Sequence, residues 1–201
     1  MKPTQFMIRL LGVTGTAFLL ACAAVGVPAT SDPYKELGQV EYLLHNHRPF
    51  PAERILNEAI GRFEAAGDKK GLAIAYDEYG FFLRHPNISE HADVYTNRGF
   101  LDRTVTYDNR FQKSIEYFLK AKAIGIEIDK PDFLCHVCYN MGVSYLLLKQ
   151  DAQACEAYDD SFKYYQKNIT RNPRAKSQVP KGFKNFEEYI LDCKKRAGCP
   201  S

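Results

Sequence analysis

From Asp32 onward, apolar residues recur at helical spacing almost everywhere, and this periodicity constrains the fold more than any other feature of the sequence. Residues three and four positions apart lie on one face of a helix, whereas a half-buried strand needs alternating apolar and polar residues. No segment sustains such alternation. The chain has 201 residues, which is enough to bury a hydrophobic core. The sequence therefore predicts an all-α protein.

The clearest predicted helix pair lies within residues 136–168. We expect Gly142 and Ala154 to lie where its two helices cross, because bulky side chains there would hold the backbones apart. Tyr145 and Tyr158 would fill the space on either side. The spacing resembles that of the tetratricopeptide repeat, W-x2-L-G-x2-Y-x8-A-x3-F-x2-A. The positions of the pattern are occupied in order by Cys138, Met141, Gly142, Tyr145, Ala154, Tyr158 and Ser161.

Two upstream segments carry weaker forms of the same pattern. Residues 76–83 resemble a first helix whose second helix covers 114–121, and residues 34–38 with 59–66 resemble an earlier pair. The matching residues are Tyr76, Tyr79, Gly80, Leu83, Ser114, Phe118 and Ala121 in the later pair, and Tyr34, Leu37, Gly38, Ala59, Phe63 and Ala66 in the earlier one.

The resemblance thus covers residues 33–168 as three divergent repeats with an insertion at 84–110. It implies stacked antiparallel helix hairpins, a TPR-like α-solenoid. The pattern is imperfect, since Cys or Tyr stands in the Trp place and two serines replace small alanines. A helical bundle without repeats is the alternative fold.

The C-terminal part changes character after the repeats. Residues 169–182 contain two prolines and several basic residues, which predicts a surface linker. In residues 183–201 apolar residues return at helical spacing, so we expect a capping helix and tail that cover the last apolar face of the array. The apolar positions are Phe183, Phe186, Tyr189, Ile190 and Cys193.

The insertion at 84–110 interleaves aromatic residues with arginines. One interpretation is an extended loop folded against the helices. The other is a recognition arm, because Tyr and Arg are enriched at binding hot spots and loops on a rigid scaffold often carry binding function. The candidate binding residues are Tyr95, Arg98, Phe100 and Arg103.

The N-terminus has the pattern of an export signal. Lys2 and Arg9 precede the uncharged apolar stretch 10–27. Within it, Leu19-Leu20-Ala21-Cys22 resembles the bacterial lipobox. The resemblance implies a signal peptide at 1–21, diacylglycerol on the Cys22 sulfur, acylation of the new amino group by a fatty acid such as palmitate, and a lipidated tether at 22–32. Three acyl chains are sufficient for stable membrane anchoring.

Two other outcomes stay open for this segment. Ala21-Cys22-Ala23 also fits A-x-A cleavage, which would release a soluble exported protein. The apolar stretch could instead remain as an uncleaved membrane anchor. All three outcomes place the folded part outside the cytoplasm. By the lipobox resemblance, Ala23 rather than Asp after the lipidated residue implies the outer membrane, with the protein expected on its periplasmic face.

These resemblances together imply an exported lipoprotein that acts as a protein–protein interaction scaffold or assembly factor in the cell envelope, without enzymatic activity or a cofactor. Its partner would be an unidentified envelope protein or peptide, since helical-repeat grooves engage peptides and helices. By family analogy the groove-facing candidates are Asp77, Asn140 and Ser144. A self-associating structural subunit is a further alternative. Nucleic acid is not expected, because a net charge of +3 is too small for a concentrated basic face.

Cys135-His136-Val137-Cys138 suggests a rival function, a metal- or thiol-dependent envelope protein. Tyr139 stands where the c-type haem signature needs His, and no second C-x-x-C supplies further zinc ligands. Buried structural thiols and a disulfide made elsewhere are the other interpretations. The loop histidines His45, His47, His85 and His91 are candidates for metal or ligand contacts or, more simply, solvated side chains. Known nucleotide-binding, hydrolase and zinc-protease motifs are missing.

An exported protein can form disulfides. In the predicted hairpin Cys138 and Cys155 differ in level by roughly 10 Å, which exceeds the ~7 Å reach of a disulfide. Cys155 near the start of its helix should instead lie close to the end of an antiparallel capping helix. The sequence therefore predicts a bridge from Cys155 to either Cys193 or Cys199.

Overall fold

The computed structural model describes residues 30–175 and 179–200. Within these ranges the regular elements are all helices, which confirms the all-α prediction. The predicted signal peptide, Cys22 and most of the 22–32 tether lie outside the described residues. The helices are α1 (Pro33–Leu37), α2 (Val40–His45), α3 (Pro49–Ala66), α4 (Lys69–Arg84), α5 (Pro86–Glu90), α6 (Ala92–Arg98), α7 (Arg110–Glu127), α8 (Pro131–Leu147), α9 (Asp151–Arg171) and α10 (Phe186–Arg196).

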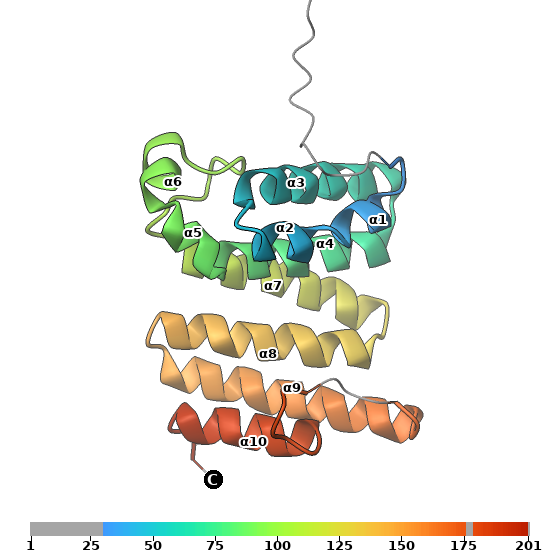
Figure 1. Ribbon diagram of the computed structural model, residues 1–201. Coiled ribbons are helices and arrows are strands. Elements are labelled where there is room, and N and C mark those ends of the chain that lie inside the picture. The colour runs from blue at the N-terminus through green and yellow to red at the C-terminus, as the bar shows by residue number, and fades with distance from the viewer. Residues whose placement is uncertain (1–29, 176–178, 201) are drawn as a thin grey trace, which may run out of the picture.

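The long helices pack in chain order as successive layers. α3 contacts α4, α4 contacts α7, α7 contacts α8, α8 contacts α9, and α9 contacts α10. Figure 1 shows these layers from α3 at one end to α10 at the other, with α1 and α2 beside α3 and α4 and with α5 and α6 at one side. Short connections make sequential helices antiparallel neighbours. The buried apolar residues form three clusters along these layers.

Three tight turns with a shared geometry reverse the chain between long helices. Gly67, Asp129 and Lys149 each adopt positive φ just after a helix ends. The next backbone N–H then bonds back five residues, from Lys130 to the Gly125 carbonyl at 3.1 Å for example. This αL ending satisfies carbonyls that the helix leaves without partners. It accounts for the close spacing of α3 with α4, of α7 with α8, and of α8 with α9.

Two glycines of the predicted repeats lie directly against aromatic rings of the next packed helix. A Cβ added to Gly142 of α8 would stand 2.4 Å from the Tyr158 ring of α9. A Cβ added to Gly80 of α4 would stand 2.8 Å from the Phe118 ring of α7. Both contacts join the same two positions of the predicted repeat pattern, its glycine and its second-helix aromatic residue. The expectation that Gly142 lies at a helix crossing is therefore confirmed, and Ala154 is fully buried in the same layer.

The earliest predicted pair differs from this arrangement. In place of one first helix over residues 34–38 and beyond, the chain forms two short helices, α1 and α2. Gly38 caps α1 through its N–H, which bonds to the Tyr34 carbonyl at 3.1 Å. Phe63 of α3 packs against Gly71 of α4, where an added Cβ would lie 2.2 Å from the ring. The close glycine contact of this layer thus joins α3 to α4.

The insertion at 84–110 is folded against the helices, but it is not extended, because α5 and α6 occupy much of it. Tyr95 and Phe100 are each 1% exposed, and their rings stack with centroids 4.3 Å apart. Both belong to the core that also includes Phe82 of α4. The prediction that Tyr95 and Phe100 are presented to a partner is therefore wrong for these two side chains, because burial of their rings closes the insertion onto the core.

The C-terminal boundaries shift from those predicted. α9 continues to Arg171, beyond the expected repeat end at 168. α10 begins at Phe186 rather than Phe183, because the Asn185 side chain caps the helix by accepting a bond from the Glu188 N–H at 2.9 Å. α10 packs on α9 and buries Phe186, Ile190 and Cys193. This is the covering position expected of a capping helix.

Candidate functional site

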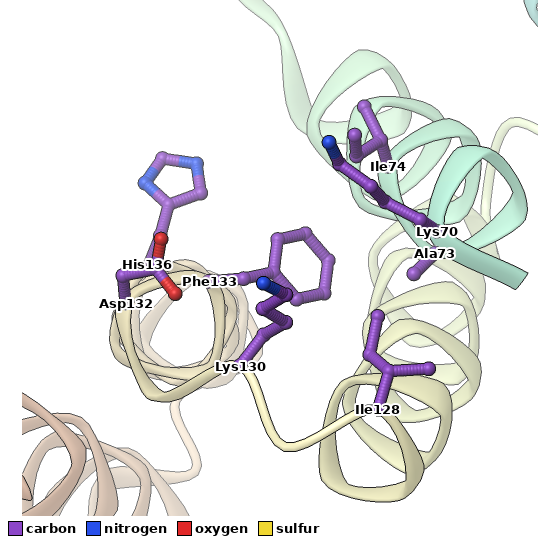
Figure 2. Close-up of a pocket in the computed structure, with 8 residues that line it drawn as sticks. All are labelled: Lys70, Ala73, Ile74, Ile128, Lys130, Asp132, Phe133 and His136. Carbon is purple, nitrogen blue, oxygen red and sulfur yellow. The ribbon is translucent and has the colours of Figure 1, made fainter. Parts of the chain in front are cut away.

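A hollow of about 360 Å³ lies between α4, α8 and the turn that joins α7 to α8. α4 provides three of its side chains, the turn provides two, and the first turns of α8 provide three. Figure 2 shows Lys70 and Ile74 extending from α4 towards α8, with Phe133 reaching from α8 towards α4. The lining residues are Lys70, Ala73, Ile74, Ile128, Lys130, Asp132, Phe133 and His136.

The lining combines an apolar floor with charged and polar side chains, of which two are lysines, one is Asp132 and one is His136. Ile74, Ile128 and Phe133 are half-buried, so part of each is open to an occupant. Lys70 and Lys130 are exposed and lean over the same space from opposite sides. An apolar side chain bound in the hollow would be removed from water while a neighbouring acidic group met the lysines. This arrangement suits the binding of a group that is partly apolar and partly acidic.

A polar network beside the hollow ties α4 to α8. The His136 Nε2 atom lies 3.4 Å from Oδ2 of Asp77 and 2.9 Å from Nδ2 of Asn140. Asn140 donates to Asp77 Oδ1 at 3.4 Å and accepts from the Arg84 guanidinium at 2.5 Å. These contacts hold the His136 ring beside Asp77 and Asn140, and the His136 side chain is 59% exposed at the edge of the hollow.

Two groups in this region have shifted pKa values. Desolvation lowers the pKa of His136, but the hydrogen bond and charge of Asp77 and the charge of Glu78 outweigh it, so the pKa is raised. Burial, together with the Asp77 charge, raises the pKa of Glu78 to about 7. Both shifts favour the protonated forms of these two side chains.

The predicted groove-facing residues make internal contacts instead. Asp77, Asn140 and Ser144 are 4%, 2% and 0% exposed. Ser144 Oγ lies 2.9 Å from Ser114 Oγ, which itself bonds to the Gly80 carbonyl at 2.7 Å. The assignment of these three residues to a partner surface is therefore wrong, because their polar groups hold α4, α7 and α8 together.

Sequence reasoning missed the residues that do line the hollow, although the repeat pattern contained a signal for four of them. Ile74 stands two residues before Tyr76, and His136 stands two residues before Cys138. Tyr76 and Cys138 occupy the same place in the two predicted repeats, so Ile74 and His136 are also equivalent. Lys70 and Asp132 are equivalent in the same way, since each stands six residues before these positions. Lys130 has no lining counterpart in the other repeat and could be found only from the packed structure.

A second pocket of about 330 Å³ lies between α3 and the insertion. It brings together Arg98, Phe100 and Arg103 of the predicted recognition arm, and both arginines are exposed. Tyr95 is not among its lining residues. The full lining is Phe50, Glu53, Arg54, Val94, Arg98, Gly99, Phe100, Leu101 and Arg103.

Glu53 at this pocket fastens the insertion to α3. Its carboxyl group is 4% exposed, and Oε1 accepts from the Leu101 N–H at 2.6 Å and from the Tyr79 hydroxyl at 3.2 Å. Burial raises the pKa of Glu53 to about 7, against the opposing effect of these hydrogen bonds. The insertion is thus held in place by a carboxyl group that gains its charge near neutral pH.

The residues of the rival metal or thiol hypothesis do not converge. The Cys135 thiol lies 3.8 Å from the hydroxyl of Ser161 on α9, whereas His136 faces Asp77 on α4. Cys135 and Cys138 are buried free thiols, and burial raises their pKa values to about 11 and about 12. A reactive thiol needs a lowered pKa, because the thiolate is the reactive form. Among the residues that the structure describes, no group of three His, Cys, Asp or Glu could hold a metal ion.

A disulfide joins Cys155 to Cys199, with the two Cα atoms 5.5 Å apart. It links the beginning of α9 to the segment that follows α10. Of the two partners left open by the sequence, Cys199 is bonded and Cys193 is a buried free thiol.

The loop histidines make local contacts. His47 pairs with Glu90 at 2.6 Å, and His45 lies 3.6 Å from Glu41. His85 accepts from the Asn87 N–H at the start of α5, and His91 lies 2.9 Å from the Asn87 carbonyl. The His47–Glu90 pair links the turn after α2 to α5, and the other three contacts are local.

Scans against protein-family models, curated proteins and solved structures find no match to this chain. In the described ranges, none of the helices combines the length and the apolar character that crossing a membrane requires.

Proposed function

We propose that this protein is a lipid-anchored TPR-like scaffold of the bacterial cell envelope, and that it binds a segment of an envelope protein in the hollow between α4 and α8. The hollow carries the proposal, because it offers an apolar floor and two lysines on a rigid helical framework. The role is one of binding or assembly rather than catalysis.

The TPR-like assignment is supported by a repeated packing contact. The Gly80–Phe118 and Gly142–Tyr158 contacts place the same two positions of the repeat pattern against each other in two helix pairs. α4 and α8, the first helices of these pairs, also contact each other directly. The hollow lies along that contact, where neighbouring repeats of a solenoid form their binding surface.

The envelope assignment is supported by the N-terminal sequence and by the disulfide. The lipobox-like segment that ends at Cys22 implies export and lipidation, with the outer membrane and its periplasmic face as the proposed location. Disulfides persist in oxidising compartments such as the bacterial periplasm. The Cys155–Cys199 bond therefore fits the same compartment.

The proposed ligand is a peptide segment with an apolar side chain next to an acidic group. Ile74, Ile128 and Phe133 would surround the apolar side chain. Lys70 and Lys130 would face the acidic group from the two sides of the hollow. An extended peptide or an amphipathic helix could present both features.

Photo-crosslinking in intact cells tests this proposal. A photoreactive phenylalanine analogue at Phe133 should give discrete crosslinked species that mass spectrometry identifies. The same analogue at Leu147, which is 45% exposed at the other end of α8, is the matched control and should give none of these species.

Charge reversal adds a second arm to the same experiment. Lys70→Glu together with Lys130→Glu should abolish the crosslinks from Phe133 while the circular dichroism spectrum stays unchanged. Crosslinks that are equally strong from Phe133 and Leu147, or that survive the double charge reversal, would exclude this hollow as the binding site.

A further inference from the structure

The end of the stack formed by α3 and the insertion carries exposed apolar and basic side chains together. Phe50 is 43% exposed and Leu101 is 48% exposed, although both are large apolar residues. They border the second pocket, which the exposed Arg98 and Arg103 also line. We call this surface the arginine–aromatic face and define it as Phe50, Arg54, Val94, Arg98, Leu101 and Arg103.

Three acidic groups around this face are engaged or buried. Glu53 is buried and accepts two hydrogen bonds, and burial raises its pKa to about 7. Glu58 lies 3.7 Å from Arg54, and Asp102 accepts from the Tyr117 hydroxyl at 2.8 Å. Asp93 is exposed but belongs to the first turn of α6, at the opposite end of that helix from Arg98. The face is therefore basic.

The described chain begins at this same end of the stack. The backbone carbonyl of Ser31 accepts a hydrogen bond from Arg62 of α3, and Arg62 also pairs with Glu36 at 2.6 Å. Thr30 stands eight positions after Cys22 in the sequence, a stretch that spans at most about 28 Å when fully extended. A lipid on Cys22 would therefore hold α3 close to the bilayer.

The other end of the stack lies much farther away. From α3 through α4, α7, α8 and α9 to α10 there are five successive packed interfaces. At about 8–10 Å between helix axes, this separates α3 from α10 by roughly 40–50 Å. The end that carries the arginine–aromatic face is thus the end at which the described chain begins (Figure 1).

We propose that the arginine–aromatic face docks on an anionic phospholipid bilayer and that its pocket receives a lipid phosphate group. This inference rests on the lipid anchor of the proposed function. Arg98 and Arg103 bind phosphate oxygens, since guanidinium groups match phosphate geometry and basic residues are attracted to anionic membrane surfaces. Phe50 and Leu101 enter the headgroup region, as apolar residues of interfacial proteins do. The stack then stands with α10 pointing away from the membrane.

The absence of Trp from the sequence makes this orientation measurable. In the full-length lipidated protein, Leu101→Trp places a single indole on the arginine–aromatic face. Leu191→Trp is the matched control, because Leu191 is 53% exposed on α10 at the far end of the stack. Each variant is reconstituted into vesicles of phosphatidylethanolamine and phosphatidylglycerol that contain phospholipids brominated in the upper acyl chain, which quench nearby indoles.

We expect the Leu101→Trp fluorescence to shift to shorter wavelength and to be quenched several-fold more than that of Leu191→Trp. Adding Arg98→Gln and Arg103→Gln to Leu101→Trp should remove most of the quenching. Leu101→Trp should also lose most of its quenching in vesicles of phosphatidylcholine alone, because these carry no anionic lipid.

Vesicle flotation separates failure of the anchor from failure of the docking. Protein that does not float with the vesicles overturns both the anchor and this inference. Protein that floats, but shows no quenching at Leu101→Trp or equal quenching at both positions, overturns the docking alone. Quenching that is unchanged by the two Arg→Gln substitutions, or in phosphatidylcholine vesicles, overturns the role of the arginines in recognising anionic lipid.

Discussion

Gly142 of α8 lies so close to the Tyr158 ring of α9 that an added Cβ would stand 2.4 Å from a ring carbon. Both residues are buried, and the ring has packed neighbours on its other sides. The helix pair can approach this closely only because Gly142 has no side chain. Gly80 and Phe118 repeat the relationship in the preceding layer.

Gly142→Ala should destabilise the protein by about 1–3 kcal/mol, because overpacking a core contact forces side chains or backbone to shift. The matched control is Gly61→Ala on α3, where an added Cβ meets nothing within 4 Å. That control should be stabilising by about 0.5–1 kcal/mol, since Ala is the better helix former. Urea unfolding followed by circular dichroism measures both changes. Equal effects of the two substitutions would refute the close contact at Gly142.

Cys155→Ser should lower the free energy of unfolding by about 2–4 kcal/mol, because the unfolded chain would regain the freedom that a loop-closing disulfide removes. The bond joins residues 44 positions apart. Dithiothreitol should destabilise the wild-type protein and leave Cys155→Ser unaffected. Cys193→Ser serves as the comparison and should keep its sensitivity to the reductant, because Cys193 is a free thiol. A wild-type protein insensitive to dithiothreitol would contradict the assigned pairing.

The buried carboxyl group of Glu53 should make stability depend on pH. Its pKa is raised from 4.5 to about 7, so the folded state holds the proton more tightly than the unfolded chain. The corresponding stabilisation is complete below about pH 4.5 and is lost as the pH rises through about 7. The shift corresponds to at most about 3 kcal/mol. Unfolding of the wild type at pH 5 and pH 8 should show this decline.

Glu53→Gln should flatten that pH dependence, since the amide does not ionise but its oxygen can still accept from the Leu101 N–H and the Tyr79 hydroxyl. Glu58→Gln on the same helix is the control, because Glu58 is exposed, and it should leave the decline in place. A decline that is unchanged in Glu53→Gln would assign the pH dependence to other groups, among which Glu78 also has a pKa raised to about 7.

Asp77→Asn should lower the pKa of His136. Desolvation already lowers that pKa, and the hydrogen bond and charge of Asp77 are the main effects that raise it. Titration of the His136 ring signals by NMR measures the change, with His45 as an internal reference on α2. An unchanged His136 titration would show that the pair, 3.4 Å apart in the structure, does not persist in solution.

Cys22→Ala should move the protein out of the membrane fraction, because the substitution removes the sulfur to which the lipid would be attached. Fractionation of cells that express the wild type and the variant measures the distribution. Continued tight attachment of the Cys22→Ala protein would favour the uncleaved apolar segment as the anchor.

Helical class, the capping helix and the Gly142 contact could be predicted from the sequence, since each depends on local periodicity or on one small residue at a fixed spacing. The orientation of the polar side chains could not be predicted from the sequence. Asp77, Asn140 and Ser144 are polar and lie on helices expected to face a groove, but all three are buried. Whether such a residue faces solvent depends on how far the neighbouring helix is rotated and displaced, which the residue's own helix does not specify.

The insertion at 84–110 also combines features that could be predicted from the sequence with features that could not. Its alternation of aromatic residues and arginines marked it as unusual, and the exposed Arg98 and Arg103 do line a pocket. Tyr95 and Phe100 are buried instead, because burying large rings against Phe82 removes more apolar surface from water than an exposed arm would.

The sequence by itself determined that the body of the chain is helical, where small residues permit close helix crossings, and that Cys155 needs a partner from the C-terminal segment. The tertiary structure decided that this partner is Cys199, that Lys70 and Lys130 share one hollow, and that the arginines of the insertion line one pocket with Phe50 of α3. Periodicity and residue size act along one helix, so they are visible in the sequence. These groupings depend instead on where helices that are distant in the chain come to lie, and only the packing of the whole core defines those positions.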